Sequence, residues 1–222
     1  HRKTTVLYSS VDTHRFDPDR YSSTQRDQLK RELGIPPDCA VVGMVGNVNR
    51  FKGCTYFIQA AGRIKQTIGK VKFLVVGRKL DTDPGYWEQL QKRTRQNSLE
   101  DDVIYTGFRE DTAAIMAILD VFVLASVLES CPVVVLEAMA MQVPVVATDV
   151  GAVSEMVLDG HTGTVVAPRN AQALSKAVLT YLAKPRDDLE AMTRAARKRV
   201  ETEFSVDRIA EQQRHIYEGL GH

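Results

Sequence analysis

The sequence predicts an α/β fold, a doubly wound parallel sheet of the Rossmann-like kind, from two observations. Short runs rich in Val, Ile and Leu recur along the chain, and helical patterns separate them. Continuous apolar runs are typical of strands buried on both faces, as in a parallel sheet. Their alternation with helices through short Gly- or Asp-containing connections is the pattern of a doubly wound sheet.

Apolar, β-branched segments predict seven strands. They are 6–8, 40–46, 71–77, 103–107, 121–125, 143–148 and 163–167. Apolar residues recur at helical spacing over 57–68 and 174–182, the polar segment 22–33 predicts an exposed helix, and helices without further strands are expected from about 171 to 219. Because ligands of such sheets bind beyond the carboxyl ends of the strands, the loops after the strands should hold the site.

Charge and cysteine usage exclude several functional classes. The 29 basic and 28 acidic residues give a formal charge of +1, so no global field attracts nucleic acid. Three widely spaced cysteines without a CxxC indicate neither a disulfide framework nor a zinc site, and they fit a reducing cytoplasm. No Asp/His cluster suggests a metal site, and the acidic segment 81–83 is predicted as an ordinary turn.

Membrane insertion is also not indicated. No apolar run reaches the roughly 18 residues needed to span a bilayer, and no charged-then-apolar leader is present in this segment. Because the net charge is close to zero, any anion must be bound by a local site.

The loop GNVNRFKG, residues 46–53, is the first candidate anion site. It follows a predicted strand and precedes an amphipathic helix that starts near Thr55. Gly46 and Gly53 would let the backbone approach a ligand, while Arg50 and Lys52 bring positive charge to a helix N-terminus. The pattern is equally compatible with a phosphate cradle and with a tight turn that carries two solvated cations.

The segment ESCPVVVLE, residues 129–137, is the second. Pro132 suits the first turn of a helix over 132–141, and Ser130 or Cys131 could cap it. The free amides at this helix N-terminus would point to the same crevice as the basic loop, where they attract anions.

Glu129 then precedes the helix, and Glu137 lies more than a turn inside it. Since an ionised group beside a core must be hydrogen-bonded, Glu137 is interpreted as an acceptor for vicinal hydroxyls of a sugar, with a solvated position as the alternative. A third loop, 149–163, offers Gly151 as a turn and Glu155 in the next helical turn, which alone indicates little.

Together these segments closely resemble the donor-binding half of retaining nucleotide-sugar glycosyltransferases of the two-Rossmann-domain, or GT-B, type, in glycosyltransferase group 1 or family 4. The resemblance is carried by the paired glutamates with their EAMA, PVVAT and DGHTG neighbours. It extends to GNVNRFKG, FLVVG, VIYTGFRED and FSVDRIAEQQRHIY, and so covers nearly the whole chain.

The resemblance implies roles for particular residues. Glu129, Lys52 and Arg50 are the implied catalytic residues: Glu129 would orient a hydroxyl of the transferred sugar, and the two cations would neutralise the diphosphate. Glu137 would bind the ribose hydroxyls. The implied donor-binding set is completed by Gly46, Asn47, Gly107, Phe108, Arg109, Ser130, Cys131, Pro132 and Val133, of which 107–109 would lie against the base and 131–133 would receive phosphate oxygens.

Three segments depart from the family pattern. Many relatives carry Arg directly after the first glycine of the diphosphate loop, where this chain has Asn47, so Arg50 would have to reach in from three residues later. The usual paired glycines after the PVVAT strand are Gly151 and Ala152 here. In the connection VLYSSVDTHRF, Ser9 and Ser10 replace the customary Asn and Gly.

The resemblance also implies a domain organisation. Residues 1–20 would be the interdomain connection and a first strand, 21–203 the nucleotide-sugar domain, and 204–222 a helix packing toward an N-terminal domain that binds the acceptor. The implied reaction transfers sugar from a nucleotide-diphosphate sugar to a glycan or lipid-linked acceptor, with retention and without a metal or other cofactor. The implied location is the cytoplasm, including the inner face of a membrane.

Two alternatives are a nucleotide-sugar epimerase of the same architecture and a nucleotide-sugar-binding module without turnover. The EAMA continuation of the paired-glutamate segment favours transfer over epimerisation. An N-terminal Rossmann-like domain in the same protein would favour the enzyme over the binding module.

Overall fold

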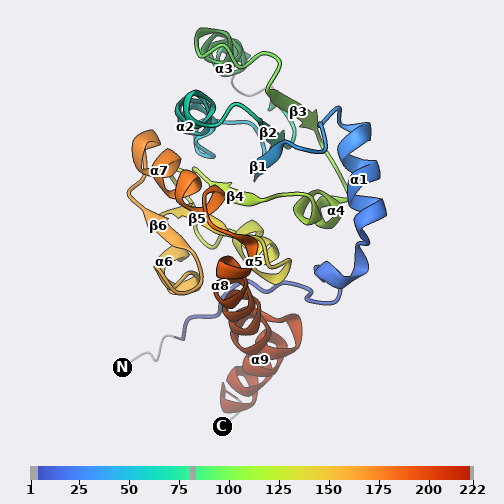
Figure 1. Cartoon of the computed structure of the whole chain (residues 1–222). Helices are drawn as coiled ribbons and strands as arrows, with labels where there is room; N and C mark the ends of the chain where they lie inside the picture. Colours follow the sequence, from blue (N-terminus) through green and yellow to red (C-terminus); the bar gives the residue numbers. More distant parts are fainter. Residues whose placement is uncertain (1–4, 81–83, 221–222) are drawn as a thin grey trace.

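A six-stranded, all-parallel sheet runs through the centre of the computed structural model, which describes residues 5–80 and 84–220 (Figure 1). The strand order is β3-β2-β1-β4-β5-β6, so the chain winds outward in both directions from β1 and β4. The strands are β1 Ala40–Val45, β2 Val71–Val76, β3 Val103–Gly107, β4 Val121–Leu124, β5 Val145–Thr148 and β6 Thr164–Val166. The predicted doubly wound α/β class is confirmed, and β1 and β4 flank the point where ligands bind in such sheets.

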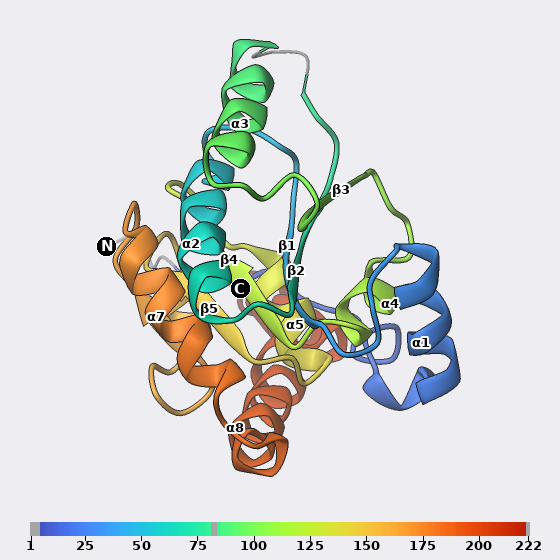
Figure 2. The same cartoon turned by 45° about the horizontal axis from the view of Figure 1, so that its top comes forward.

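Helices cover both faces of this sheet (Figure 2). One layer consists of α1 Ser23–Glu32, α4 Thr112–Ala117, α5 Val133–Ala140, α6 Val153–Met156 and α8 Arg186–Arg199, and the other of α2 Cys54–Thr67, α3 Pro84–Gln96 and α7 Ala171–Leu182. The residues of β1 alternate between two core clusters, which is why their sequence is continuously apolar. The exposed helix predicted over 22–33 is α1, where Ser22 and Gln25 form a capping box.

The strand predicted at 6–8 is wrong. A seventh strand could join this sheet only at one of its edges, beside β3 or beside β6. The segment lies beside the C-terminal helices instead. The amide of Val11 donates to the Phe204 carbonyl at 3.0 Å, and the Tyr8 and Phe204 rings meet edge to face with centroids 5.6 Å apart. Val6 and Leu7 are exposed, so their apolar side chains are not explained by burial in a sheet.

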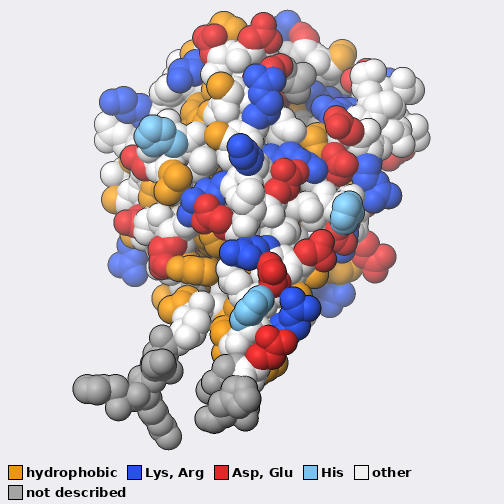
Figure 3. Space-filling model, turned by 90° about the horizontal axis from the view of Figure 1, so that it is seen from below, with side chains coloured by type: hydrophobic (Ala, Val, Ile, Leu, Met, Phe, Trp, Pro, Cys, Tyr) orange, Lys and Arg blue, Asp and Glu red, His pale blue; other side chains and the backbone are white. Residues whose placement is uncertain are grey.

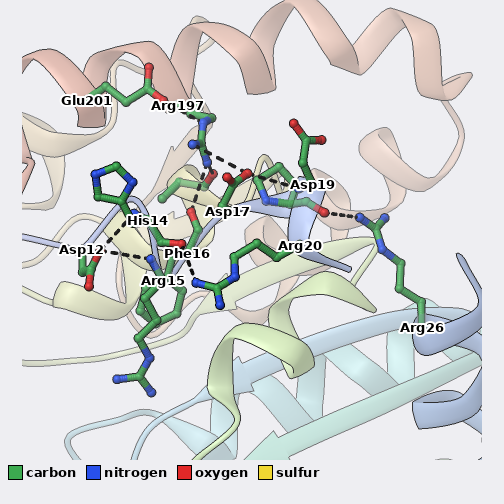
Figure 4. Close-up of polar contacts among 12 residues, drawn as sticks. Asp12, His14, Arg15, Phe16, Asp17, Asp19, Arg20, Arg26, Arg197 and Glu201 are labelled. Carbon is green, nitrogen blue, oxygen red and sulfur yellow. Dashed lines mark hydrogen bonds and ion pairs between the residues drawn. The ribbon is translucent and has the colours of Figure 1, made fainter. Parts of the chain in front are cut away.

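The segment before α1 is held against the body by arginines (Figure 4). Arg197 of α8 donates to the carbonyl oxygens of Phe16 at 3.0 Å and Ala140 at 2.6 Å. Asp12 accepts from the amide of Arg15 at 3.0 Å, and a 3-10 turn, η1 Pro18–Arg20, follows. These contacts fix the backbone of Arg15, whose side chain points away from the labelled cluster in Figure 4.

Helices complete the chain after β6, as predicted. A five-residue π-helical segment, η2 Val200–Phe204, separates α8 from α9 Val206–Leu220. In Figure 1, α9 projects from the body on the side from which the N-terminal segment also emerges. Basic and acidic side chains are interspersed over the face seen in Figure 3, in keeping with the near-zero net charge.

No helix within the described residues is long and apolar enough to cross a bilayer. The turn predicted at 81–83 lies outside the described residues.

Gly53 illustrates how closely the connections pack at the carboxyl edge. Its φ is +65°, and a Cβ built on it would lie 1.8 Å from the Ala125 carbonyl oxygen. We expect Gly53→Ala to destabilise the fold by at least about 1–2 kcal/mol, because the left-handed backbone alone costs that much for a residue with a side chain. Urea unfolding measures the loss, with Gly69→Ala as the control, since a Cβ at Gly69 meets nothing within 4 Å. Equal midpoints for the two variants would contradict this close approach.

Candidate functional site

Backbone hydrogen bonds join the ends of β1, β2 and β3 and the loops that follow them at the carboxyl edge of the sheet. The amide of Gly46 donates to the Val76 carbonyl at 2.8 Å, and that of Gly77 donates to the Gly107 carbonyl at 2.9 Å. A Cβ on Gly77 would lie 2.1 Å from the Gly46 carbonyl oxygen, so this approach requires glycine. The predicted diphosphate loop and the predicted base-side segment therefore belong to one continuous surface.

Lys52 and Glu129 meet where the loop after β1 packs on the loop after β4. The Lys52 ammonium nitrogen Nζ lies 2.6 Å from Glu129 Oε1, which also accepts from the Ser126 hydroxyl at 2.8 Å. The side chain of Glu129 is 11% exposed and that of Lys52 is 26% exposed. The amide of Val127 donates to the Phe51 carbonyl at 2.8 Å and joins the two loops. Two residues predicted to act on the same ligand are thus brought into contact.

The N-terminus of α5 opens beside this pair. The helix begins at Val133 with Pro132 as its N-cap residue and no side-chain cap. The prediction that Ser130 or Cys131 caps the helix is therefore wrong, because Pro132 occupies the capping position and has no group to cap with. The Ser130 carbonyl instead accepts from the Ala152 amide at 2.8 Å. Because no side chain caps the first amides of α5, these amides are open to an anion.

Glu137 lies one turn into α5, half-buried between core residues of the same helix. Burial raises the pKa of Glu137 above its ordinary value, and the positive charge of Arg15 opposes that shift. Arg15 also donates to the Glu110 carbonyl at 3.0 Å. An acceptor that is partly desolvated and near a cation suits a ligand with hydroxyl donors.

The segment predicted to lie against a base is open to solvent. Gly107 has φ +70°, and a Cβ built there meets nothing within 4 Å. Phe108 is 56% exposed. Arg109, in contrast, turns to Asp111, with Nε 2.7 Å from Oδ1, and this ion pair lowers the pKa of the Asp111 carboxyl. The structure thus leaves Gly107 and Phe108 accessible and holds Arg109 in a local pair.

Two cations in the loops at this edge of the sheet have aromatic partners. The guanidinium of Arg50 lies 5.1 Å from the ring centroid of Tyr86 on α3. That of Arg78, which follows β2, lies 4.5 Å from the centroid of Phe108. Sequence reasoning missed Arg78, although its place directly after the predicted strand FLVVG was a signal that could have identified it.

The loop after β5 completes the edge. Gly151 has φ +56°, and a Cβ there would lie 2.3 Å from the Ser130 carbonyl oxygen. Glu155 is not simply solvated: its carboxylate accepts from the Tyr8 hydroxyl, and its carbonyl accepts from Arg199 at 2.8 Å. Ala152, which stands where the family has a second glycine, is tolerated here because its contact with Ser130 is made by its backbone amide. A side chain on residue 152 does not prevent that contact.

Metal ligands are not grouped at this edge. Within residues 5–80 and 84–220, no cluster of three or more His, Cys, Asp or Glu side chains is placed to hold a metal ion.

The solved structures of other proteins include close matches to this fold. HepE of Anabaena in complex with UDP-glucose superposes with a TM-score of 0.89 at 26% identity, over 97% of this chain and 57% of that one. The C-terminal domain of the group 1 glycosyl transferase LpcC from Francisella tularensis superposes with a TM-score of 0.78 at 26% identity, over 88% of this chain and 99% of that one.

Sequence comparison gives the same result. The lipopolysaccharide core biosynthesis mannosyltransferase LpsB of Rhizobium meliloti is 29% identical over 218 residues, which cover 97% of this chain and 61% of LpsB. The chain spans about half to three fifths of the length of the curated relatives it matches. The family model for glycosyl transferases group 1 matches residues 25–199. The chain therefore belongs to the glycosyl transferases group 1, and its fold is that of the C-terminal domain of a GT-B enzyme.

Proposed function

We propose that this chain is the donor-binding domain of a retaining glycosyltransferase that transfers sugar from a nucleotide-diphosphate sugar to a glycan or lipid-linked acceptor. The observation that carries the proposal is the meeting of Lys52 and Glu129 at 2.6 Å beside the uncapped N-terminus of α5. The complex of the relative HepE with UDP-glucose supports the class of donor.

The diphosphate would bind between Lys52 and the backbone of residues 131–133, where Cys131 and Val133 carry amide donors and Pro132 has none. Cleavage of the bond between sugar and phosphate builds negative charge on the departing diphosphate, and preorganised cations and helix N-terminal amides stabilise it. Arg50 would join them by leaving Tyr86, its aromatic partner in the present structure. These groups supply the charge stabilisation by themselves, so the proposal needs no metal.

The carboxylates would bind the two sugars of the donor. Glu137, half-buried and without a capping role, would accept from the vicinal ribose hydroxyls. Glu129 would accept from a hydroxyl of the transferred sugar near the loop of Gly151. Gly107 and Phe108 would lie against the base, where the backbone is open.

The acceptor would bind to a second domain, which corresponds to the part of the relatives that this chain does not cover. Residues 5–20 and α9 would connect or pack to it. Tyr217 of α9 is 64% exposed and Val206 is 48% exposed, and the cavity of about 760 Å³ beside them is lined by Tyr8, Glu155 and residues of α9. The family match favours transfer over the epimerase alternative.

Lys52→Ala is the direct test of the diphosphate site. We expect a nucleoside diphosphate to bind roughly 10- to 150-fold more weakly, because a charge-assisted contact is lost, while the bare nucleoside binds almost as before. Isothermal calorimetry with UDP, GDP and their nucleosides measures both. Lys176→Ala, an exposed residue of α7, is the control for the lost charge. Equal losses for diphosphate and nucleoside would contradict the role of Lys52.

A further inference from the structure

Tyr8 of the N-terminal segment contacts α6, the helical turn that follows the loop after β5. The segment passes below α6 in Figure 1, and the Tyr8 hydroxyl donates to the carboxylate of Glu155, 147 residues away along the chain. The ring of Tyr8 packs edge to face on that of Phe204, with centroids 5.6 Å apart. The ring contact and the hydroxyl bond together fix the position of this side chain.

The two sides of α6 are held by different parts of the chain. The helix has only four residues, and so short a helix has little stability of its own. Val153 and Met156 are fully buried and hold its inner side on the core. Arg199 donates to the carbonyl oxygens of Glu155 at 2.8 Å and Met156 at 3.0 Å, and so caps the end of the helix. Tyr8 adds a bond to a side chain on the outer side, which fixes the orientation of the turn.

The residues just before α6 press on the backbone of the paired-glutamate segment. The Ala152 amide donates to the Ser130 carbonyl at 2.8 Å. A Cβ built on Gly151 would lie 2.3 Å from that oxygen and 2.7 Å from the carbonyl oxygen of Glu129. Because close-packed groups transmit displacements, a shift of α6 would move residues 129 and 130 or break these contacts. The position of Glu129 therefore depends on α6.

Resting on the proposed function, we propose that Tyr8 is a positioning residue for the sugar that the donor transfers. Through Glu155 it holds the loop of Gly151 against the backbone of residues 129 and 130. The side chain of Glu129, proposed to accept from a hydroxyl of that sugar, then keeps its place. Tyr8 acts without touching the donor, and the N-terminal segment becomes part of the support of the sugar subsite.

The diphosphate end of the site has a separate support. The loop of Lys52 is joined to the loop after β4 by the bond from the Val127 amide to the Phe51 carbonyl at 2.8 Å, which does not involve α6. Loss of the Tyr8 hydroxyl should therefore weaken binding of the sugar much more than binding of the diphosphate. The bond to Glu155 raises the pKa of Tyr8, so the hydroxyl is a neutral donor near neutral pH.

The test measures, by calorimetry, the ratio between the affinities for a nucleotide sugar and for its own diphosphate. The probes are UDP-glucose with UDP, GDP-mannose with GDP and ADP-glucose with ADP, and the pair that the wild-type protein binds most tightly is used. Tyr8→Phe keeps the ring on Phe204 and removes the donor, so we expect the ratio to fall roughly 2- to 10-fold, as for the loss of one hydrogen bond. Tyr21→Phe, at a half-buried tyrosine before α1, is the control and should leave the ratio unchanged.

Variants of Glu155 test whether Tyr8 acts through this one bond. Glu155→Gln keeps an oxygen that can accept from the Tyr8 hydroxyl and should retain most of the ratio, whereas Glu155→Ala should lower it as far as Tyr8→Phe does. Because both residues act through the same bond, the double variant Tyr8→Phe/Glu155→Ala should lower the ratio no further than either single variant.

Three results would overturn the inference. Equal weakening of the nucleotide sugar and the diphosphate by Tyr8→Phe would make Tyr8 a residue of general structure. An unchanged ratio in Tyr8→Phe, or losses that add in the double variant, would disconnect Tyr8 from the sugar subsite. Failure of the wild-type protein to bind any of the probes would refute the proposed donor site itself, and the inference with it.

Discussion

The 222-residue chain alone is expected to bind a nucleotide sugar but to transfer almost no sugar to an acceptor. The groups proposed to bind the donor all lie on this chain, whereas the acceptor is proposed to bind to a domain that corresponds to the part of the relatives this chain does not cover. Holding two reactants in register contributes roughly 7–11 kcal/mol to catalysis, or about five to eight powers of ten in rate. On the proposed two-domain organisation, closure of both domains would provide this register, and the chain alone would lack it.

The measurement is incubation of the chain with its tightest-binding nucleotide sugar and a panel of glycan and lipid acceptors, followed by mass spectrometry. Calorimetry on the same sample establishes that the donor binds. Slow hydrolysis of the donor is compatible with the proposal, because the groups that stabilise the leaving diphosphate are local. Robust transfer by this chain alone would disprove the two-domain organisation. Where transfer is obtained in a longer protein, the anomeric configuration of the product tests retention.

Glu137→Gln is expected to weaken nucleoside diphosphate binding roughly 10- to 150-fold while making the empty protein more stable. The affinity falls because an ionised acceptor, worth roughly 1.5–3 kcal/mol to the ribose hydroxyls, becomes a neutral amide of the same shape. The stability rises because burial disfavours the ionised carboxylate, as the raised pKa of Glu137 shows.

The sign of the pH dependence follows from that shift. A carboxyl whose pKa is higher in the folded protein binds its proton more tightly there, so its favourable contribution is complete below the ordinary value of 4.5. That contribution disappears as the pH rises through the raised pKa. We therefore expect Glu137→Gln to have the higher Tm at pH 7.5 and the difference to shrink below pH 4.5.

Thermal unfolding at several pH values, together with calorimetry using UDP or GDP, checks both halves of this prediction. Glu88→Gln is the matched control, because Glu88 is exposed on α3. An unchanged diphosphate affinity would make Glu137 a structural residue. A lower Tm for the variant near neutral pH would show that the carboxylate stabilises the empty fold.

The central strands could be predicted because each is buried on both faces, which leaves a continuous apolar run in the sequence. The segment 6–8 has the same composition, yet it is not a strand. Whether an apolar run joins a sheet depends on whether an edge is available to it, and that is a property of the whole fold. Local propensity likewise placed the start of α5 one residue early, because proline is common at the first helical position whereas Pro132 is the N-cap residue here.

The candidate site was partly predictable for a similar reason. Topology brings the loops of Lys52 and Glu129 to one edge of the sheet, so their proximity could be expected from the order of strands and helices. Their direct contact depends on side-chain rotamers and on the turn at Gly53, which the sequence does not specify. The position of Arg78 directly after a predicted strand could be read from the sequence, but its contact with Phe108 could not, because Phe108 lies 30 residues away along the chain.

The contact between Lys52 and Glu129 has a consequence for what the empty site attracts. Each residue neutralises the other, so an anion that binds Lys52 must displace it from Glu129. A ligand gains the lysine only if it also gives the glutamate a replacement partner. A molecule with phosphate at one end and sugar hydroxyls at the other can do both. The abundant anions of a cell, which lack the hydroxyls, are thereby disfavoured as competitors without any steric barrier.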